Sequence, residues 1–127
     1  MKSESEIQQL IQLEAPKLKV NLMRNNNVAF KDENGRMVRA GLGNSSPNQA
    51  YKSSDLIGWT EIVIDNSMVG KTVAIFTAVE VKKEDWKPKY NDTRETYQRN
   101  FIEWVKTKGG IAAFCNSVEE FRKLIIK

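Results

Sequence analysis

The sequence contains no histidine and a single cysteine among its 127 residues. Because the sequence has no imidazole, several classes of site are excluded. They are the Ser-His-Asp and Cys-His triads, the HExxH metalloproteases, nucleases with His-bound metals and zinc fingers with His ligands. One cysteine also excludes an internal disulfide and a four-cysteine zinc site. If the protein is an enzyme, its chemistry must use carboxylates, lysines, hydroxyls or a hard cation such as Mg²⁺, which prefers oxygen ligands.

Long hydrophobic runs are also missing. Runs such as 73–76 and 111–115 are far shorter than the roughly 20 residues of a transmembrane helix. The N-terminus is polar where a signal peptide would be apolar. We therefore expect no membrane association, and the unpaired Cys115 fits a cytoplasmic location. A net charge of +4 permits an anionic partner.

The length favours one domain with one core over residues 1–127. In the first half, hydrophobic periodicity predicts a helix that Ser3 caps and Pro16 ends. A short strand is expected from Lys17 to Arg24 and a hairpin around the turn at 32–35. Residues 41–48 have a loop composition, and 62–64 are expected to form a core strand.

The second half alternates strands and helices. We expect a long strand over 72–82, a helix capped by Asp92 and stopped at 109–110, a short strand over 111–115, and a last helix capped by Ser117 with its apolar residues inward. The class is therefore α/β, with a central mixed sheet flanked by helices. The passage 72–115 is a right-handed crossover unit if its two strands are parallel.

Glu80 and Lys82 are the residue pair with the clearest chemical meaning. Alternation along the strand puts both on one face, with the carboxylate about 7 Å along the backbone from the ammonium. Asp55 lies 25 residues earlier, before a strand that could neighbour this one. Two carboxylates can hold Mg²⁺, and a lysine can position the attacking water and neutralise phosphate charge. The simpler interpretation is a lysine that only neutralises a buried glutamate.

Several segments, in this order, resemble the VRR-NUC nucleases, which are small virus-type replication-repair nucleases of the PD-(D/E)xK superfamily. The segments are Arg24-Asn25-Asn26, Val38-Arg39-Ala40-Gly41, Ser53-Ser54-Asp55-Leu56-Ile57-Gly58-Trp59, Ala78-Val79-Glu80-Val81-Lys82, Gln98-x-x-Phe101-Ile102 and Gly109-Gly110-Ile111-Ala112. The resemblance extends over nearly the whole chain. Ser54 stands where the superfamily name has Pro, which leaves the ligand Asp55 in place.

The resemblance implies a single restriction-endonuclease-like domain with a metal-dependent phosphodiesterase site. Asp55, Glu80 and the carbonyl of Val81 would be ligands of Mg²⁺ or Mn²⁺, and Lys82 would be the catalytic lysine. Gln98 matches a family glutamine that points toward the active site, although an exposed polar residue near a helix start would look the same.

The family also has an N-terminal helical Glu-x-x-apolar-Gln motif, which resembles Glu4 and Gln8 here. The two residues share a helical face because they are four positions apart. The resemblance assigns Glu4 a role near the metal, through water. The simpler interpretation of Glu4 is a favourable charge at a helix N-terminus.

Basic and aromatic residues supply candidate contacts to DNA. For DNA contacts we favour Arg24, Arg39 and Lys83, together with Gln8, and we regard Lys17 and Lys19 as weaker choices. Any one of these cations can also be ordinary solvated surface charge. Trp59 is expected in the core, whereas Trp86 and Tyr90 lie in a polar loop suited to packing on DNA or a second subunit.

Together these features predict a metal-dependent DNA endonuclease, encoded by a phage or prophage and acting in the cytoplasm of a bacterial host. The resemblance implies a homodimer that cuts branched DNA such as four-way Holliday junctions, since two active sites must address two symmetry-related strands. One alternative is a sequence-specific restriction-type endonuclease, for which 127 residues leave little room for a recognition element. Another is a non-catalytic DNA-binding or partner-docking module that uses Asp55, Glu80 and Lys82 as a buried ion cluster.

Overall fold

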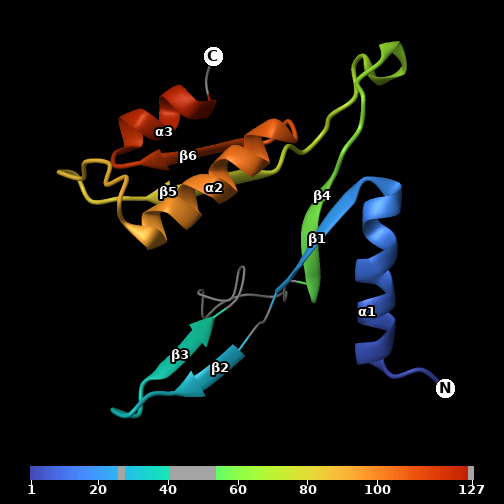
Figure 1. Cartoon of the computed structure of the whole chain (residues 1–127), viewed down its shortest axis with the longest axis horizontal. Coiled ribbons are helices and arrows are strands. Elements are labelled where there is room, and N and C mark those ends of the chain that lie inside the picture. Colours follow the sequence, from blue (N-terminus) through green and yellow to red (C-terminus); the bar gives the residue numbers. More distant parts are fainter. Residues whose placement is uncertain (26–27, 41–53, 126–127) are drawn as a thin grey trace. The chain divides into compact units, whose positions relative to one another are not determined.

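The computed structural model describes residues 1–25, 28–40 and 54–125, with only the backbone of 28–30 and 38–40 (Figure 1). It is an α/β protein whose described strands pair in small, open sheets. The chain divides into two compact units, Met1–Ile62 and Val63–Lys127, and each is described by itself. The predicted α/β class is confirmed. The endonuclease-like fold with a central mixed sheet, and the single domain over 1–127, stay predictions.

Helix α1, Glu4–Glu14, begins where the sequence predicts. The hydroxyl of Ser3 accepts a hydrogen bond of 3.2 Å from the backbone N–H of Glu6, as in a capping box. Pro16 does not end the helical path at once, because the chain continues as a 3-10 helix, Ala15–Leu18. Proline is tolerated in a first turn, where its missing N–H would have no partner in the helix. The predicted strand from Lys17 is therefore wrong at its start.

The first unit contains two antiparallel strand pairs. Strand β1, Val20–Arg24, pairs with β4, Leu56–Thr60, and strand β2, Val28–Lys31, pairs with β3, Met37–Ala40. The β2–β3 turn has Asp32 at its start, whose carboxylate accepts from the backbone N–H groups of Asn34 and Arg36 at 2.9 and 2.8 Å. The predicted hairpin is confirmed. The predicted loop over 41–48 lies outside the described residues.

The second unit is a strand–helix–strand passage followed by a helix. Strand β5, Thr77–Val81, pairs with β6, Ile111–Cys115, and the two are parallel, as the crossover prediction requires. Helix α2, Thr93–Thr107, connects them and contributes Ile102 and Val105 to a small core shared with Ala112 and Cys115 of β6. Helix α3, Val118–Ile125, follows.

The predicted caps of both helices in this unit are observed. The carboxylate of Asp92 accepts from the backbone N–H of Glu95 at 3.0 Å, and the hydroxyl of Ser117 accepts from that of Glu120 at 3.1 Å. After α2 the chain turns at Gly109, whose φ of 89° lies in the left-handed region that suits a helix end. Local capping signals thus located these boundaries well.

Three predictions for this part of the chain are wrong. Residues 62–64 form no strand and their side chains are exposed, and β5 begins at Thr77 rather than at residue 72. Alternating apolar and polar side chains are compatible with a strand, but a strand also needs a neighbouring strand to hydrogen-bond its backbone groups. On α3, Val118, Phe121 and Ile125 are exposed rather than inward. None of the described helices is long and apolar enough to cross a membrane.

Gly58 is the point of closest backbone approach in the β1–β4 pair. It lies opposite Leu22 in the register, and a Cβ built on it would stand 1.7 Å from the carbonyl oxygen of Asn21. Two non-bonded atoms cannot lie that close, so the strands would have to move apart. The position therefore requires glycine if β4 is to keep its pairing.

We expect Gly58→Ala to destabilise the protein by about 3 kcal/mol, the upper end of typical overpacking costs, because backbone must move to admit the methyl group. Urea denaturation followed by circular dichroism measures the change. Gly70→Ala is the matched control: a Cβ there meets no atom within 4 Å, and only its φ of 82° opposes alanine. The control should cost about 1 kcal/mol. Equal losses for the two variants would contradict the close approach.

Candidate functional site

A glutamine connects the predicted catalytic carboxylate and lysine. Glu80 is on β5, Lys82 directly follows that strand, and Gln98 comes from the second turn of α2. Lys82 Nζ donates to Gln98 Oε1 at 2.7 Å, and Gln98 Nε2 donates to Glu80 Oε1 at 2.8 Å. We call this arrangement the Glu80–Gln98–Lys82 chain. The structure thus adds Gln98, which the resemblance had pointed to, to the Glu80 and Lys82 pair expected from the sequence.

Lys82 is held from two further directions. Its backbone N–H donates to the carbonyl of Cys115 at 2.9 Å, which extends the pairing with β6 past the end of β5. Its ammonium lies 5.4 Å from the ring centroid of Phe114, within the range of a cation–π interaction. The lysine head is therefore fixed near the carboxylate.

The two oxygens of Glu80 have different surroundings. Oε1 accepts from Gln98, whereas Oε2 takes no hydrogen bond from the part of the chain that the structure describes. Glu80 itself is half-buried at the end of the apolar side of β5, beside Ala78. One carboxylate oxygen is thus hydrogen-bonded within the protein, and Glu80 as a residue lines a cavity.

That cavity, of about 350 Å³, is rich in charge, and we call it the charged cavity. Glu80, Val81, Lys82 and Gln98 line it. Its remaining lining includes the basic residues Lys83, Lys89 and Arg94 and the acidic residues Asp92 and Glu95. Lys83, a predicted DNA contact, is highly exposed, and its ammonium lies 3.8 Å from the carboxylate of Asp85. The basic groups give the cavity a surface suited to a phosphate.

Glu95 has a structural role that the expected cap at Asp92 does not reveal. Its carboxylate is buried, with 5% of the residue exposed, and accepts from three donors. These are Trp86 Nε1 at 2.7 Å, the backbone N–H of Lys89, and Arg99 Nη2 at 3.0 Å. The i, i+4 spacing of Glu95 and Arg99 was the available sequence signal.

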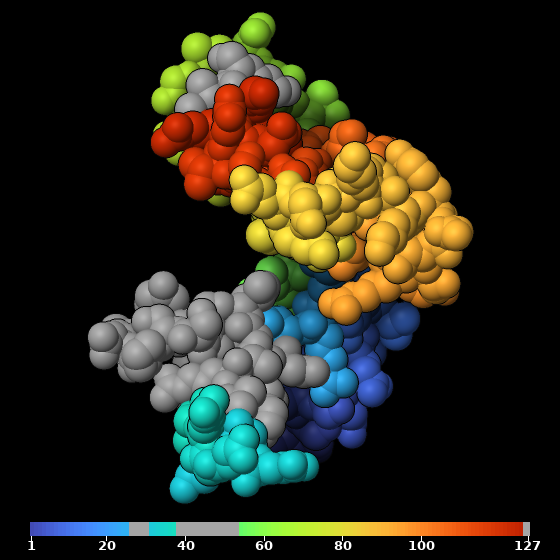
Figure 2. Space-filling model, turned by 90° about the vertical axis from the view of Figure 1, so that its left-hand side faces the viewer, coloured from blue at the N-terminus to red at the C-terminus, as the bar shows by residue number. Residues whose placement is uncertain are grey.

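Glu95 therefore attaches the loop after β5 to α2, and the two lie side by side in the space-filling view (Figure 2). Trp86 contacts residues of its own unit through both its N–H and its ring, which packs on Phe114 with 5.0 Å between centroids. Tyr90 stays exposed, with the guanidinium of Arg99 4.6 Å from its ring centroid. Of the two loop aromatics, Tyr90 remains available to a partner.

The hydrogen bond from the backbone N–H of Lys89 holds the pKa of the Glu95 carboxyl below its ordinary value of about 4.5. The bonds from Trp86 and Arg99, and the charge of Arg99, act in the same direction, whereas burial opposes them. The ionised form is therefore the one that the surrounding donors favour.

In the first unit, four other predicted site residues surround one polar cavity of about 440 Å³. Helix α1 presents Glu4 and Gln8 to it, Arg24 ends β1, and Asp55 directly precedes β4. The backbone N–H of Asn25 donates to the carbonyl of Asp55 at 2.8 Å, which holds the start of β4 beside the end of β1. The face shared by Glu4 and Gln8 is as the sequence predicts.

The remaining sequence-predicted residues are less informative. Arg39 lies on β3, and its side chain is outside the described part. Lys17 pairs with Glu14 at 3.3 Å, and Lys19 is exposed. Trp59 is half-buried on β4. Within the described ranges, no group of three or more acidic or cysteine residues could hold a metal ion, and Asp55 belongs to the first unit while Glu80 and Lys82 belong to the second.

We expect Glu95→Gln to destabilise the protein near neutral pH, because an amide accepts less strongly and leaves Arg99 without a counter-charge. Since the folded-state pKa of Glu95 is lowered, its stabilisation is present above the ordinary value of about 4.5 and is lost as pH falls through the folded value. Urea denaturation at several pH values should show the difference from the native protein shrinking in acid. The exposed Glu103→Gln on the same helix should show little difference at any pH. A pH-independent loss for Glu95→Gln would contradict this account.

Comparisons with known proteins add no family to this picture. No protein-family model matches the chain, and neither a curated protein nor a solved structure matches it. The resemblance to the VRR-NUC nucleases therefore depends on the sequence segments themselves. The function has to be argued from the residues and their geometry.

Proposed function

We propose that the protein is a divalent-metal-dependent DNA endonuclease. The observation that supports this most strongly is the Glu80–Gln98–Lys82 chain, in which a helix glutamine holds a carboxylate and an ammonium at the end of a strand. Phosphodiester hydrolysis needs an activated water and compensation of the charge that develops on the phosphate. A carboxylate and a lysine supply groups for both tasks without histidine.

The donor set fits a hard cation. The proposal assigns Asp55, Glu80 and the carbonyl of Val81 as ligands of Mg²⁺ or Mn²⁺, with Glu4 acting through water. All these donors are oxygens, which such ions prefer. Glu80 Oε2 takes no hydrogen bond from described residues, and Asp55 is exposed beside the polar cavity. When bound, the cation would polarise the phosphate and make a coordinated water more acidic.

The protein's own residues would divide the remaining work. Lys82 would stabilise the charge on the phosphate oxygens and help to orient the water. Gln98 would be a positioning residue that keeps Lys82 and Glu80 in place. Arg24, Lys83 and Arg39, with Gln8, would contact the DNA backbone, and Lys89 and Arg94 add positive charge to the charged cavity.

The broader parts of the proposal follow from the resemblance. They are a restriction-endonuclease-like fold over residues 1–127, a homodimer, four-way junctions as substrate, and a phage or prophage origin with activity in the bacterial cytoplasm. A restriction-type endonuclease remains the alternative enzyme.

A non-catalytic DNA-binding module is the second candidate. It is favoured by one specific observation, namely that Gln98 satisfies Lys82 and one oxygen of Glu80 within the protein. A structural ion cluster needs no more than that. The two candidates differ in whether cleavage occurs at all, so activity measurements separate them.

We expect Lys82→Ala to lower the cleavage rate by about 10² to 10³-fold, because one group that stabilises the transition state is lost. The measurement is single-turnover cleavage of labelled DNA with Mg²⁺ or Mn²⁺, with chelator as the metal-free control. DNA binding measured in Ca²⁺ should change little. Lys106→Ala, which removes an exposed lysine on α2, should cleave normally. A protein that binds DNA but shows no cleavage with either ion would favour the non-catalytic module.

We expect the protein to cut a four-way junction faster than a linear duplex of the same sequence. A dimer with two active sites can address the two symmetry-related strands of a junction at once. The rates are compared at equal DNA concentration in Mg²⁺. Equal cutting of the two substrates would remove the junction preference but keep the nuclease, whereas cutting at one duplex sequence would favour the restriction-type alternative.

A further inference from the structure

A second cavity adjoins the charged cavity and has the opposite character. It measures about 680 Å³, and its lining is mainly apolar. Glu80, Arg94 and Gln98 line both cavities, so the two share a wall. We call the second one the apolar cavity.

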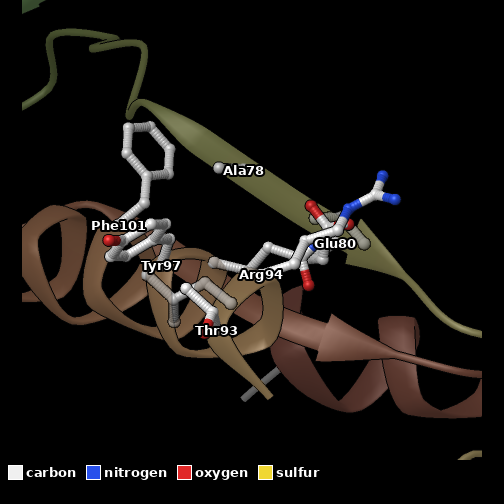
Figure 3. A pocket seen from close by; sticks show the side chains of 9 residues that line it. Ala78, Glu80, Thr93, Arg94, Tyr97 and Phe101 are labelled. Carbon is white, nitrogen blue, oxygen red and sulfur yellow. The ribbon is translucent and has the colours of Figure 1, made fainter.

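Two aromatic rings and two charged groups occupy opposite ends of the apolar cavity. The rings of Tyr97 and Phe101 lie at one end, and Glu80 and Arg94 lie at the other (Figure 3). Tyr97 and Phe101 are four residues apart, which places them on one face of α2. Between the two ends, Ala78 of β5 is small enough to leave the space open.

Tyr97 contributes little to the core of its unit. Tyr97 is 69% exposed. A tyrosine that packs in a core buries most of its large apolar ring, and Tyr97 does not. Phe101 is half-buried and meets Trp104 edge-on, with 6.0 Å between centroids. A fixed ring beside an exposed one forms a surface on which a flat, apolar group can stack.

A nucleotide has one charged part and one flat apolar part, which match the charged cavity and the apolar cavity. Its phosphate suits the charged cavity, where Lys82, Lys83, Lys89 and Arg94 gather, and its base is a flat ring suited to the aromatic end. A base inside a duplex cannot enter, because its faces are stacked and its edge is paired. The occupant must therefore be an unpaired nucleotide.

We propose that the apolar cavity binds an unpaired nucleobase of DNA, on Tyr97 and Phe101, next to the phosphate at the Glu80–Gln98–Lys82 chain. This inference rests on the proposed nuclease function for the role of that phosphate, and it names the substrate class. The enzyme selects phosphodiester bonds beside unpaired nucleotides, such as those at branch points or in single strands.

The test measures binding without cleavage, so that it does not depend on catalysis. The full-length protein in Ca²⁺ is titrated with a single-stranded oligonucleotide containing 2-aminopurine, with the same strand made abasic, and with the duplex. The base-containing single strand should bind about tenfold more tightly than the abasic strand, as expected for one stacked base. The 2-aminopurine fluorescence should be quenched on binding.

Variants assign the effect to the cavity. Tyr97→Ala should lower the affinity for the base-containing strand about tenfold and remove most of the quenching, whereas Tyr97→Phe, which keeps the ring, should retain both. Phe121→Ala on α3 is the matched control, because it removes a partly exposed aromatic that does not line the cavity. Its affinity should be unchanged.

Three results would overturn the inference. The first is unchanged DNA affinity of Tyr97→Ala, and the second is equal affinity of the native protein for the abasic and base-containing strands. The third is an equal loss of affinity of Tyr97→Ala for single strand and duplex. The last would make Tyr97 a general backbone contact. If the quenching pattern holds but Mg²⁺ and Mn²⁺ give no cleavage, the base site stands and the nuclease fails. If cleavage occurs without dependence on Tyr97, the nuclease stands and the base site fails.

Discussion

The buried carboxylate of Glu95 is the interaction on which the second unit's site depends. It accepts from Trp86, from the backbone of Lys89 and from Arg99, so it joins the loop after β5 to the start of α2. Burying a charge is costly unless donors surround it, and here they come from both segments at once. With the loop and helix held together, Gln98 can meet Glu80 and Lys82 from one side while Phe114 meets Lys82 from the other.

The amide of Gln98 suits its place between two opposite charges. Its oxygen accepts and its nitrogen donates, so it can satisfy an ammonium and a carboxylate at the same time without adding charge. A second carboxylate there would repel Glu80, and a second cation would repel Lys82. The arrangement connects both charged groups through one amide and leaves one oxygen of Glu80 without a hydrogen bond from the described residues. The proposed metal-dependent nuclease would use the pair in this arrangement.

Local signals predicted much of this structure, because they act over a few residues. Ser3, Asp92 and Ser117 cap helices where the sequence places them, and the Asp32 turn forms the expected hairpin. The i, i+2 and i, i+4 spacings brought Glu80 near Lys82 and Glu4 near Gln8. Non-local requirements were harder to predict. Residues 62–64 look like a strand but pair with no strand in the described part of the chain. The burial of Glu95 depends on Trp86 and Lys89, which its own helix does not reveal.

The wall shared by the two cavities has a consequence for how this site can change over evolution. Gln98 and Arg94 border both spaces, so a substitution at either position alters the surroundings of Glu80 and the shape of the apolar cavity together. Under the proposed function, the chemistry at Glu80 and the choice of ligand would change together. Tyr97 and Phe101 stand at the other end, away from the carboxylate (Figure 3). Changes in what the protein binds should therefore concentrate on Tyr97 and Phe101 of α2 rather than on Arg94 and Gln98.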